Sequence, residues 1–488
     1  MDVVVVGAGP TGMMLAADLS VAGVDVVLVE RRATSELVGS RAGGFHARTL
    51  EILDQRGIVD RFLREGTTHP VPYVGAASGM AFLDISDFPT RHRYTLGLFQ
   101  NRIEGILAAW IEELGVPVKR GCEVAGMAQD DKGVEVTLDD GRTWRAKYLV
   151  GADGGRSLIR KLAEIEFPGW DASMSALIAE VEVTEPTPVG ITYDDSGLHG
   201  LSLMEDRRTM RVVTAERKLE SSSEPTLEDL RANLVAVYGT DFGVHSPTWI
   251  SRFTDATRQA GEYRNDRVFL AGDAAHIHSP AGGQGIGLGI QDAVNLAWKL
   301  AQVVKGESPD SLLDSYHAER HPATARALQY TMATSALQRP GPRISALRDQ
   351  VEWLARMPEA RINLAGLITG LDVHYDLGTG HPLLGRRMPD LDLVVGGAQV
   401  PVYSFLRDVR PVLINFAAVG SLDAAFWADR IHFLDAEYHG EWVLPVLGDV
   451  SPPTGVLVRP DGYVGWVGEG TTFGLSGALG LWCGTQPT

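Results

Sequence analysis

The segment from residue 3 to residue 30 constrains the fold more than any other part of the sequence. Residues 3–6 are four valines, which predict a buried strand, and the glycine-rich segment GAGPTG at 7–12 follows directly and opens a helix near Pro10. A second hydrophobic strand over residues 24–29 ends at Glu30. This arrangement is typical of a dinucleotide-binding β-α-β unit, and the alternative is a chance glycine loop.

The residues of this loop have separate physical roles in such a unit. Gly7 permits the tight turn, Gly9 lets the backbone approach a pyrophosphate, and Gly12 lets the helix pack on the strand. The N-terminus of the helix offers free N–H groups and the positive end of its dipole to the phosphate. Glu30 is placed to accept hydrogen bonds from an adenosine ribose.

Composition narrows the class of protein. The 488 residues suffice for two or three domains, and 62 acidic against 44 basic residues give a net charge of −18, which opposes binding to nucleic acid or an anionic membrane. No apolar run is long enough to cross a bilayer, and a strand at residue 3 leaves no room for a signal peptide. Cys122 and Cys483 lie far apart, so we expect neither a disulfide framework nor a metal site. We expect a reduced, cytoplasmic monomer or homodimer.

Changes in the pattern of predicted helices, strands and turns divide the chain into four expected segments of an α/β protein. Residues 1–165 form the first part of the dinucleotide-binding domain. Residues 166–265 are predicted to form an antiparallel sheet that covers a ligand, with one helix over 227–238. Residues 266–377 return to the first domain with long helices over 288–304 and 312–336. Residues 378–488 form a further domain without a Cys-x-x-Cys pair, for which we expect a structural or oligomerisation role.

A second nucleotide-contacting candidate follows the segment RVFLA at 267–271, which is apolar from residue 268 onward. This predicted strand ends in Gly272-Asp273, which places a carboxylate at the carboxyl edge of the sheet, where ligands of α/β folds bind. Asp273 is a candidate for binding a ribityl chain, or else an N-cap aspartate. The glycine-rich loop at 282–287 opens the long helix, so its amides and dipole would stabilise negative charge on a flavin. The loop favours the flavin interpretation.

Three motifs occur together in a recognisable order: GAGPTG at 7–12, VGADGGRS at 150–157 with Arg160 one turn later, and AGDAAHIH at 271–278. In this order they resemble flavoprotein aromatic hydroxylases of the para-hydroxybenzoate hydroxylase type (class A), and more closely the bacterial polyketide and rifampicin monooxygenases. The resemblance covers nearly the whole chain. It implies a Rossmann-like FAD-binding domain, an inserted antiparallel substrate-binding sheet and a C-terminal thioredoxin-like domain that lacks redox cysteines.

The motifs and the resemblance together give a set of expected FAD contacts. These are Gly7, Gly9, Pro10, Thr11, Gly12, Glu30, Arg31, Arg41, Gln100, the backbone at Val124, Gly272, Asp273, Pro280, Gly283, Gly285, Ile286 and Gly287. The resemblance also assigns Asp153 and Arg160 to a motif that serves both FAD and NADPH; the alternative is a capped turn. The family usually has Asn at position 287. If that Asn acts through its backbone N–H, glycine preserves the contact, and if it acts through its side chain, glycine weakens flavin binding.

The resemblance implies a hydroxylation, in which NADPH reduces FAD, dioxygen forms a flavin hydroperoxide, and an electron-rich aromatic ring attacks its distal oxygen. A second GxGxxG motif is absent from the sequence, so NADPH is expected to visit transiently. The expected substrate is a polycyclic aromatic polyketide or an antibiotic, in biosynthesis or in resistance. Its pocket wall is expected to include Arg41, His199, Met204 and Met210. Baeyer–Villiger oxygen insertion and a non-catalytic flavin- or nucleotide-binding protein remain alternatives.

No catalytic side chain stands out. His46, His276 and His278 are candidates for proton carriers, but histidines in motifs are more often packed hydrogen-bonding residues. A metal ligand set is not expected either.

Overall fold

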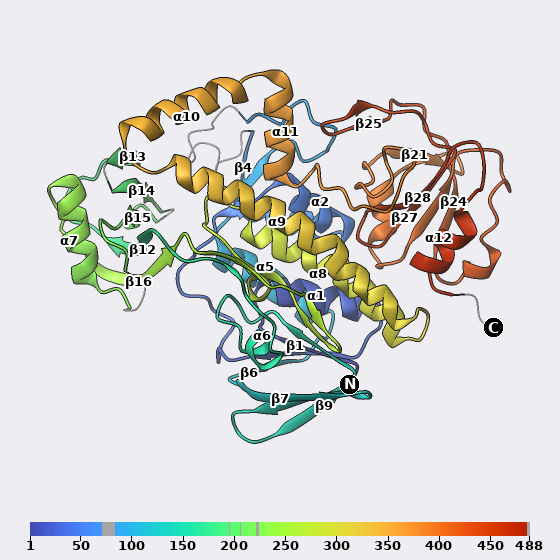
Figure 1. The fold of residues 1–488 in the computed structure, drawn as a ribbon, viewed down its shortest axis with the longest axis horizontal. Helices are drawn as coiled ribbons and strands as arrows, with labels where there is room; N and C mark the ends of the chain where they lie inside the picture. The colour runs from blue at the N-terminus through green and yellow to red at the C-terminus, as the bar shows by residue number, and fades with distance from the viewer. Residues whose placement is uncertain (71–82, 195, 205, 221–223, 486–488) are drawn as a thin grey trace.

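The computed structural model describes residues 1–70, 83–194, 196–204, 206–220 and 224–485. The chain forms a mixed α/β structure with several sheets. Figure 1 shows the central domain with the β12–β16 sheet on its left and the C-terminal domain, in orange and red, on its right. The long helices α8 (Gly285–Val304) and α9 (Asp314–Leu337) run through the centre between them.

The central sheet has the strand order expected of a dinucleotide-binding fold. Its strands, in spatial order, are β18 (Arg264–Asn265), β19 (Val268–Leu270), β10 (Tyr148–Gly151), β1 (Val3–Val6), β2 (Val26–Glu30) and β6 (Val118–Arg120). All neighbours are parallel except β18 and β19. The chain proceeds from β1 outward through β2 and β6 on one side and through β10 and β19 on the other. The switch point between β1 and β10 is therefore where a ligand is expected to bind.

Helix α1 and a series of shorter helices and strands complete this part of the domain. Helix α1 (Pro10–Val21) is buried from Gly12 to Leu19 because it lies between the sheet and α8, which explains its apolar character on all sides. The other elements of this part are β3 (Gly44–Phe45), α2 (Ala47–Gln55), α3 (Val59–Glu65), β4 (Thr67–His69), β5 (Thr95–Gly97), α5 (Gln100–Glu113), β7 (Val124–Asp130), β8 (Gly133–Leu138), β9 (Thr143–Ala146) and α6 (Leu158–Leu162).

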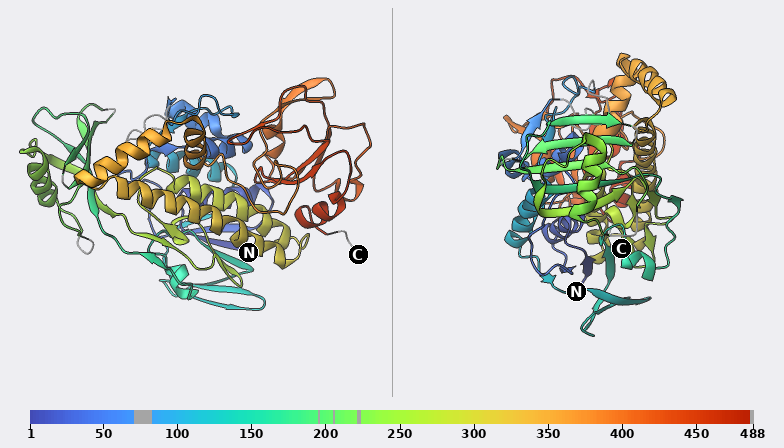
Figure 2. Two further views of the ribbon diagram at one scale, coloured as in Figure 1. Left: turned by 45° about the horizontal axis from the view of Figure 1, so that its top comes forward. Right: turned by 90° about the vertical axis from the view of Figure 1, so that its left-hand side faces the viewer.

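The antiparallel sheet expected within residues 166–265 is present. Its order is β13 (Gly190–Asp194), β14 (Gly197–Leu203), β15 (Thr209–Ala215), β12 (Ser175–Glu182) and β16 (His245–Thr254). Helix α7 (Leu227–Tyr238), predicted with the same bounds, lies across its outer face (Figure 2, right). Leu230 and Leu234 of α7 pack there on Leu177 and other apolar residues of the sheet, so the opposite face is left for a ligand. The short strands β11 (Gly169–Trp170), β17 (Thr257–Gln259) and β20 (His276–Ile277) form a separate sheet.

The C-terminal domain contains a four-stranded sheet. Its strands, in spatial order, are β24 (His432–Asp435), β23 (Val412–Asn415), β27 (Gly455–Val458) and β28 (Val464–Gly468). The domain also contains the hairpin β21 (Asp392–Val395) with β22 (Ala398–Pro401), the pair β25 (Val443–Leu444) with β26 (Gly448–Asp449), and helix α12 (Leu475–Trp482). The turn between β27 and β28 reaches into the central domain. There Arg48 donates to the carbonyl of Asp461 at 2.9 Å and Arg56 to that of Pro460 at 3.0 Å. The two domains are thus joined through buried contacts.

Some elements differ from the prediction. Helix α8 begins at Gly285 rather than at residue 288, so the end of the glycine-rich segment forms its first turn. Helices α10 (Pro342–Ala355) and α11 (Pro358–Thr369) were not predicted, although each begins with a proline in its first turn, a common helix start. None of the helices within the described ranges is long and apolar enough to span a membrane.

Candidate active site

The glycine loop after β1 has the geometry of a phosphate-binding turn. Gly7 has φ +105°, and a Cβ there would lie 2.3 Å from the carbonyl oxygen of Ala152. A Cβ on Gly12 would lie 1.9 Å from the carbonyl oxygen of Gly7, so only glycine allows α1 to pack this closely. At Gly9, by contrast, a Cβ would meet none of the described atoms within 4 Å. Gly9 therefore leaves open space before the N-terminus of α1, which no side chain caps.

Glu30 ends β2 beside this loop and is buried. Its carboxylate accepts hydrogen bonds from the backbone N–H groups of Ala8 and Arg32, each at 2.8 Å. Arg32 also forms ion pairs with Glu30 and with Glu104. A carboxylate offers about four acceptor positions, so Glu30 retains capacity for a ribose hydroxyl. The predicted neighbour Arg31 is exposed to solvent.

The second motif meets the first in space. Asp273 lies in a short 3-10 turn (η1, Gly272–Ala274) that follows β19, and Gly272 has φ +62°. A Cβ on Gly272 would lie 2.6 Å from Oγ1 of Thr11, so this turn packs directly on the start of α1. Asp273 and Thr11 line the same large cavity. The sequence prediction that two distant segments form one site is consistent with this geometry.

The N-terminal end of α8 forms another side of the cavity. Pro280, Gly283, Gly285 and Ile286 line it, and no side chain caps the helix. The free N–H groups of the first turn and the helix dipole therefore favour negative charge there.

Gly287 lies differently. It lines a smaller neighbouring pocket, and a Cβ on it would lie 2.7 Å from Oγ1 of Thr49 on α2. A side chain at position 287 would thus point toward α2. This orientation favours the alternative in which residue 287 acts through its backbone, which glycine preserves.

Arg41 and Gln100 both line the large cavity. Arg41 donates a hydrogen bond to Oγ of Ser251 at 2.8 Å, which ties the loop of the first domain to strand β16. Gln100 begins α5 and donates to Glu104 at 2.9 Å. Val124 begins β7, close to Cys122, whose N–H donates to the carbonyl of Glu30.

Asp153 and Arg160 lie outside the residues that line the cavity. Asp153 accepts hydrogen bonds from the hydroxyl of Ser157 and from the first N–H groups of α6, so it forms the capped turn that the sequence left as the alternative. Arg160 donates to the carbonyls of Ala274 and Gly155 at 2.7 and 3.0 Å. Its guanidinium stacks on Phe167, 3.6 Å from the ring centroid. Arg160 therefore links this motif to the turn that carries Asp273.

For two of the four residues expected in the wall of the substrate pocket, the expected position is wrong. Successive side chains of a strand point to opposite faces of a sheet. Met204 lines the cavity, but Met210 packs with the apolar residues beneath α7. His199 is also fully buried on that outer side, where it hydrogen-bonds Thr214 at 2.8 Å. Other residues, which no motif in the sequence indicates, face the cavity instead, among them Ile178, Glu180, Leu198, Ser202, Arg211 and Val213. The two-residue alternation of β14 and β15 separates their side chains into two sets, and the packing of α7 decides which set faces away from the cavity.

The motif histidines are hydrogen-bonded. His276 contacts Oδ2 of Asp292 at 2.6 Å, and the same carboxylate accepts the N–H of Gly272 at 3.0 Å. Asp292 also pairs with Arg320 at 2.8 Å. Burial raises the pKa of the Asp292 carboxyl, but the charges of His276 and Arg320 outweigh this effect and lower it. Asp292 was not recognised in the sequence, and it anchors the turn that presents Asp273.

The large cavity has a volume of about 1590 Å³. The glycine loop, the Asp273 turn and the start of α8 border it, and so does the inner face of the β12–β16 sheet. The open space at Gly9, the uncapped helix ends and the carboxylate of Asp273 fit an FAD molecule, whereas Glu30 lies beside the glycine loop, outside the residues that line the cavity. In the described part of the chain, no group of three His, Cys, Asp or Glu side chains is placed to hold a metal ion.

Comparison with known families decides the class. The model of the FAD binding domain family matches residues 1–331, and that of the aromatic-ring hydroxylase C-terminal family matches residues 381–486. The chain belongs to the FAD-dependent aromatic-ring hydroxylases. As a member of this family it is a flavin-dependent monooxygenase.

The relatives of this hydroxylase match it along nearly its whole length. A rifampicin monooxygenase of Streptomyces venezuelae is 43% identical over 477 residues, which cover 96% of each chain. A 12-dehydrotetracycline 5-monooxygenase/anhydrotetracycline 6-monooxygenase of Streptomyces rimosus is 42% identical over 504 aligned positions, with 99% of each chain covered. The structure of the anhydrotetracycline hydroxylase OxyS from Streptomyces rimosus superposes with a TM-score of 0.92 at 41% identity and covers 100% of this chain and 99% of that one.

Proposed function

We propose that this hydroxylase uses FAD and NADPH to hydroxylate a polycyclic aromatic polyketide or an antibiotic. The volume and walls of the large cavity carry this proposal. Its volume of about 1590 Å³ exceeds the roughly 300–1000 Å³ of common small-molecule pockets. It can therefore admit a multi-ring substrate beside a flavin. The related enzymes named for rifampicin and for tetracyclines support the same substrate class.

The residues around the cavity have distinct tasks in this proposal. Gly9 and Thr11 at the start of α1 would hold the pyrophosphate, and Asp273 the ribityl chain. The first turn of α8 would stabilise negative charge on the flavin ring. Bound FAD supplies the redox chemistry, in which electrons from NADPH activate dioxygen for transfer of one oxygen atom.

The sheet would hold the substrate against the flavin. Ile178, Leu198 and Val213 give its inner face apolar contact area, and Glu180 with Arg211 gives polar groups on the same face. Arg41, fixed by Ser251, lies where the sheet and the first domain meet and is placed to contact a substrate oxygen. These contacts would exclude water from the reacting atoms and orient the ring.

We further infer that residues 1–165 and 266–377 form the two parts of the FAD-binding domain and that residues 166–265 form the substrate-binding sheet. Residues 378–488 would form a thioredoxin-like domain with a structural role. Both cysteines are free, and Cys483 is buried, consistent with a reduced cytoplasmic enzyme. NADPH is expected to bind transiently near the cavity.

The test uses the purified protein with rifampicin and anhydrotetracycline as probes. We expect a flavin absorbance spectrum that NADPH bleaches faster when an accepted aromatic compound is present, and a product heavier by one oxygen atom. Nuclear magnetic resonance of the product separates a new hydroxyl group from the ester that Baeyer–Villiger insertion would give. A colourless protein, or a flavin that NADPH does not reduce, would refute the proposal.

A further inference from the structure

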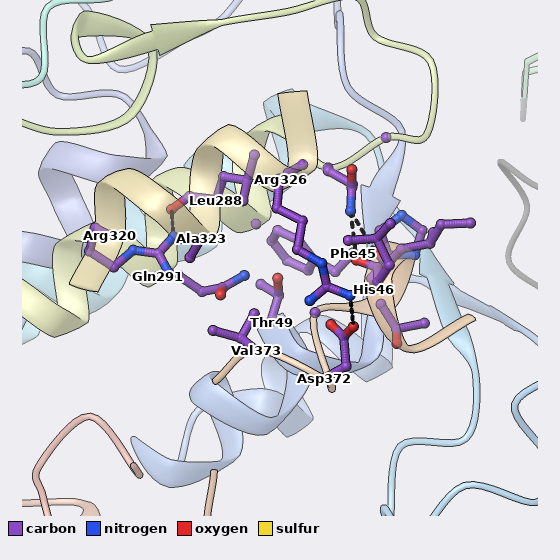
Figure 3. Close-up of a pocket in the computed structure, with 18 of the residues that line it drawn as sticks. Phe45, His46, Thr49, Leu288, Gln291, Arg320, Ala323, Arg326, Asp372 and Val373 are labelled. Carbon is purple, nitrogen blue, oxygen red and sulfur yellow. Dashed lines mark hydrogen bonds and ion pairs between the residues drawn. The ribbon is translucent and has the colours of Figure 1, made fainter. Parts of the chain in front are cut away.

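A second, smaller pocket of about 200 Å³ adjoins the large cavity, and Figure 3 shows residues that line it. Gly44, Phe45, His46 and Gly283 line both spaces, so they form the partition between them. The remaining walls come from α2, α8, α9, the end of α11 and the segment that follows it.

The pocket is lined by buried hydrogen-bond acceptors. Gln291 and Gln284 are 5% and 6% exposed, and Asp372 is 6% exposed. Within the described residues, Oε1 of each glutamine and Oδ1 of Asp372 accept no hydrogen bond. Figure 3 shows the side chains of Gln291 and Thr49 pointing toward each other, with the Arg326–Asp372 pair beside them.

Water satisfies such a set of acceptors. A buried acceptor left without a donor costs about 1–3 kcal/mol. A water molecule occupies roughly 30 Å³ of liquid volume and commonly makes about three hydrogen bonds. A pocket of about 200 Å³ therefore has room for several water molecules, which can donate to the three side chains.

The two ends of the pocket carry titratable groups. At the outer end, half-exposed Arg326 pairs with Oδ2 of Asp372, and Arg386 donates to the backbone carbonyl of Asp372 at 3.5 Å. His374 also lines the pocket. Burial raises the pKa of Asp372 above its ordinary value, and the charge of Arg326 offsets this effect only in part.

At the inner end, Nε2 of His46 lies 2.7 Å from the carbonyl of Gly282. A carbonyl can only accept, so Nε2 carries the proton and Nδ1 presents a lone pair. That Nδ1 atom has no partner among the residues described.

The proposed reaction requires a proton from solvent. Hydroxylation converts substrate, NADPH, dioxygen and one proton into hydroxylated substrate, NADP⁺ and water. Without a substrate, the anionic reduced flavin, dioxygen and one proton give oxidised flavin and hydrogen peroxide. In both cases a proton must enter a site that excludes bulk water.

We propose that the smaller pocket is a water-filled proton path that leads from buried Asp372, which half-exposed Arg326 links to the surface, past Gln291, to His46 at the floor of the large cavity. The proposal rests on the proposed function for the demand for protons. Gly287 keeps the inner end open, since a Cβ there would lie 2.7 Å from Oγ1 of Thr49.

The kinetic test is stopped-flow reoxidation of the holoenzyme by dioxygen, without aromatic substrate, after reduction by dithionite. For Gln291→Met we expect the rate of reoxidation to fall about tenfold or more, toward the roughly 100-fold typical of a lost proton-transfer group. The solvent isotope effect should rise, and added imidazole should restore the rate. Gln291→Glu, which keeps an oxygen in the pocket, should retain most of the rate. Gln399→Met, on the exposed hairpin β21–β22, is the matched control.

The structural test is a high-resolution crystal structure of the FAD-bound protein. We expect ordered water within hydrogen-bonding distance of Gln291, Gln284 and Asp372, and loss of the water at residue 291 in Gln291→Met. A dry pocket, or equal reoxidation rates in Gln291→Met and wild type, would overturn the proposal. Because dithionite supplies the electrons, failure of NADPH to reduce the flavin would refute the proposed function and leave this test intact.

Discussion

Replacing Arg459 with methionine tests how firmly the C-terminal domain is joined to the FAD-binding domain. Arg459 is fully buried in the turn between β27 and β28, and two of its nitrogens donate to Glu319 on α9 at 2.7 Å each. It also pairs with Asp461 at 2.5 Å. Methionine keeps the apolar stem but removes the charge. Lys299, 2.9 Å from Glu319, then faces two buried carboxylates alone.

The expected cost follows from this burial. Removing one partner of a buried ion pair destabilises a protein by about 3–5 kcal/mol. The matched control is Arg61→Met, because Arg61 forms a bidentate pair with Glu113 at 2.7 and 2.8 Å in which the two side chains are 32% and 55% exposed. Exposed pairs contribute about 0–1 kcal/mol. The double variant Arg459→Met/Glu319→Gln should recover part of the loss, since it removes one uncompensated charge.

The assay is urea unfolding of the holoenzyme, followed by circular dichroism and by flavin fluorescence. Glu319 is next to Arg320, which holds Asp292, and Asp292 accepts the N–H of Gly272 beside Asp273. Flavin release should therefore shift to lower urea together with unfolding in Arg459→Met. If its midpoint equals that of Arg61→Met, the buried network does not stabilise the fold and this reasoning is refuted.

Three further predictions concern the binding sites and pH. Gly9→Ala should fold normally, because its Cβ meets no described atom within 4 Å, yet it should bind FAD at least about tenfold more weakly. Gly7→Ala should instead lower the melting temperature, because a Cβ there would lie 2.3 Å from the carbonyl oxygen of Ala152. Arg459 and Lys299, against the effect of burial, lower the pKa of Glu319 from 4.5 to about 2. The stability that Glu319 contributes is thus complete above pH 4.5 and is lost as the pH falls to about 2. The expected loss is about 3 kcal/mol. It is measured by comparing the free energy of unfolding of wild type and Glu319→Gln as the pH is lowered. Met204→Ala should change the dissociation constant of an aromatic ligand, measured by flavin fluorescence, whereas Met210→Ala should lower stability and leave that constant unchanged.

Local patterns in the sequence were sufficient to predict the nucleotide-binding elements. The four valines of β1 and the glycines that follow fix the strand, the turn and the helix, because each role depends on residues within one turn of the chain. Helix α7 has the predicted bounds, since Thr226 and Asp229 form a capping box and Gly239 ends the helix in the left-handed conformation. The pairing of Asp273 with the glycine loop followed from the rule that ligands bind at the carboxyl ends of parallel strands.

Contacts between distant segments could not be predicted in this way. The faces of β14 and β15 depend on register, and a shift of one residue exchanges all inward and outward side chains. His199 and Met210 were therefore placed on the wrong face. The role of Arg160 depends on a carbonyl at Ala274, and that of Arg459 on Glu319 of another domain. Nothing in the local pattern around these residues indicates such partners.

A crystal structure of the protein purified with its flavin tests the central claim most directly. We expect FAD in the large cavity, with its pyrophosphate at the N-terminus of α1, its ribityl chain at Asp273 and its ring before the first turn of α8. Electron density that places the flavin elsewhere, or a cavity filled by side chains in protein that fails to take up FAD, would contradict the account.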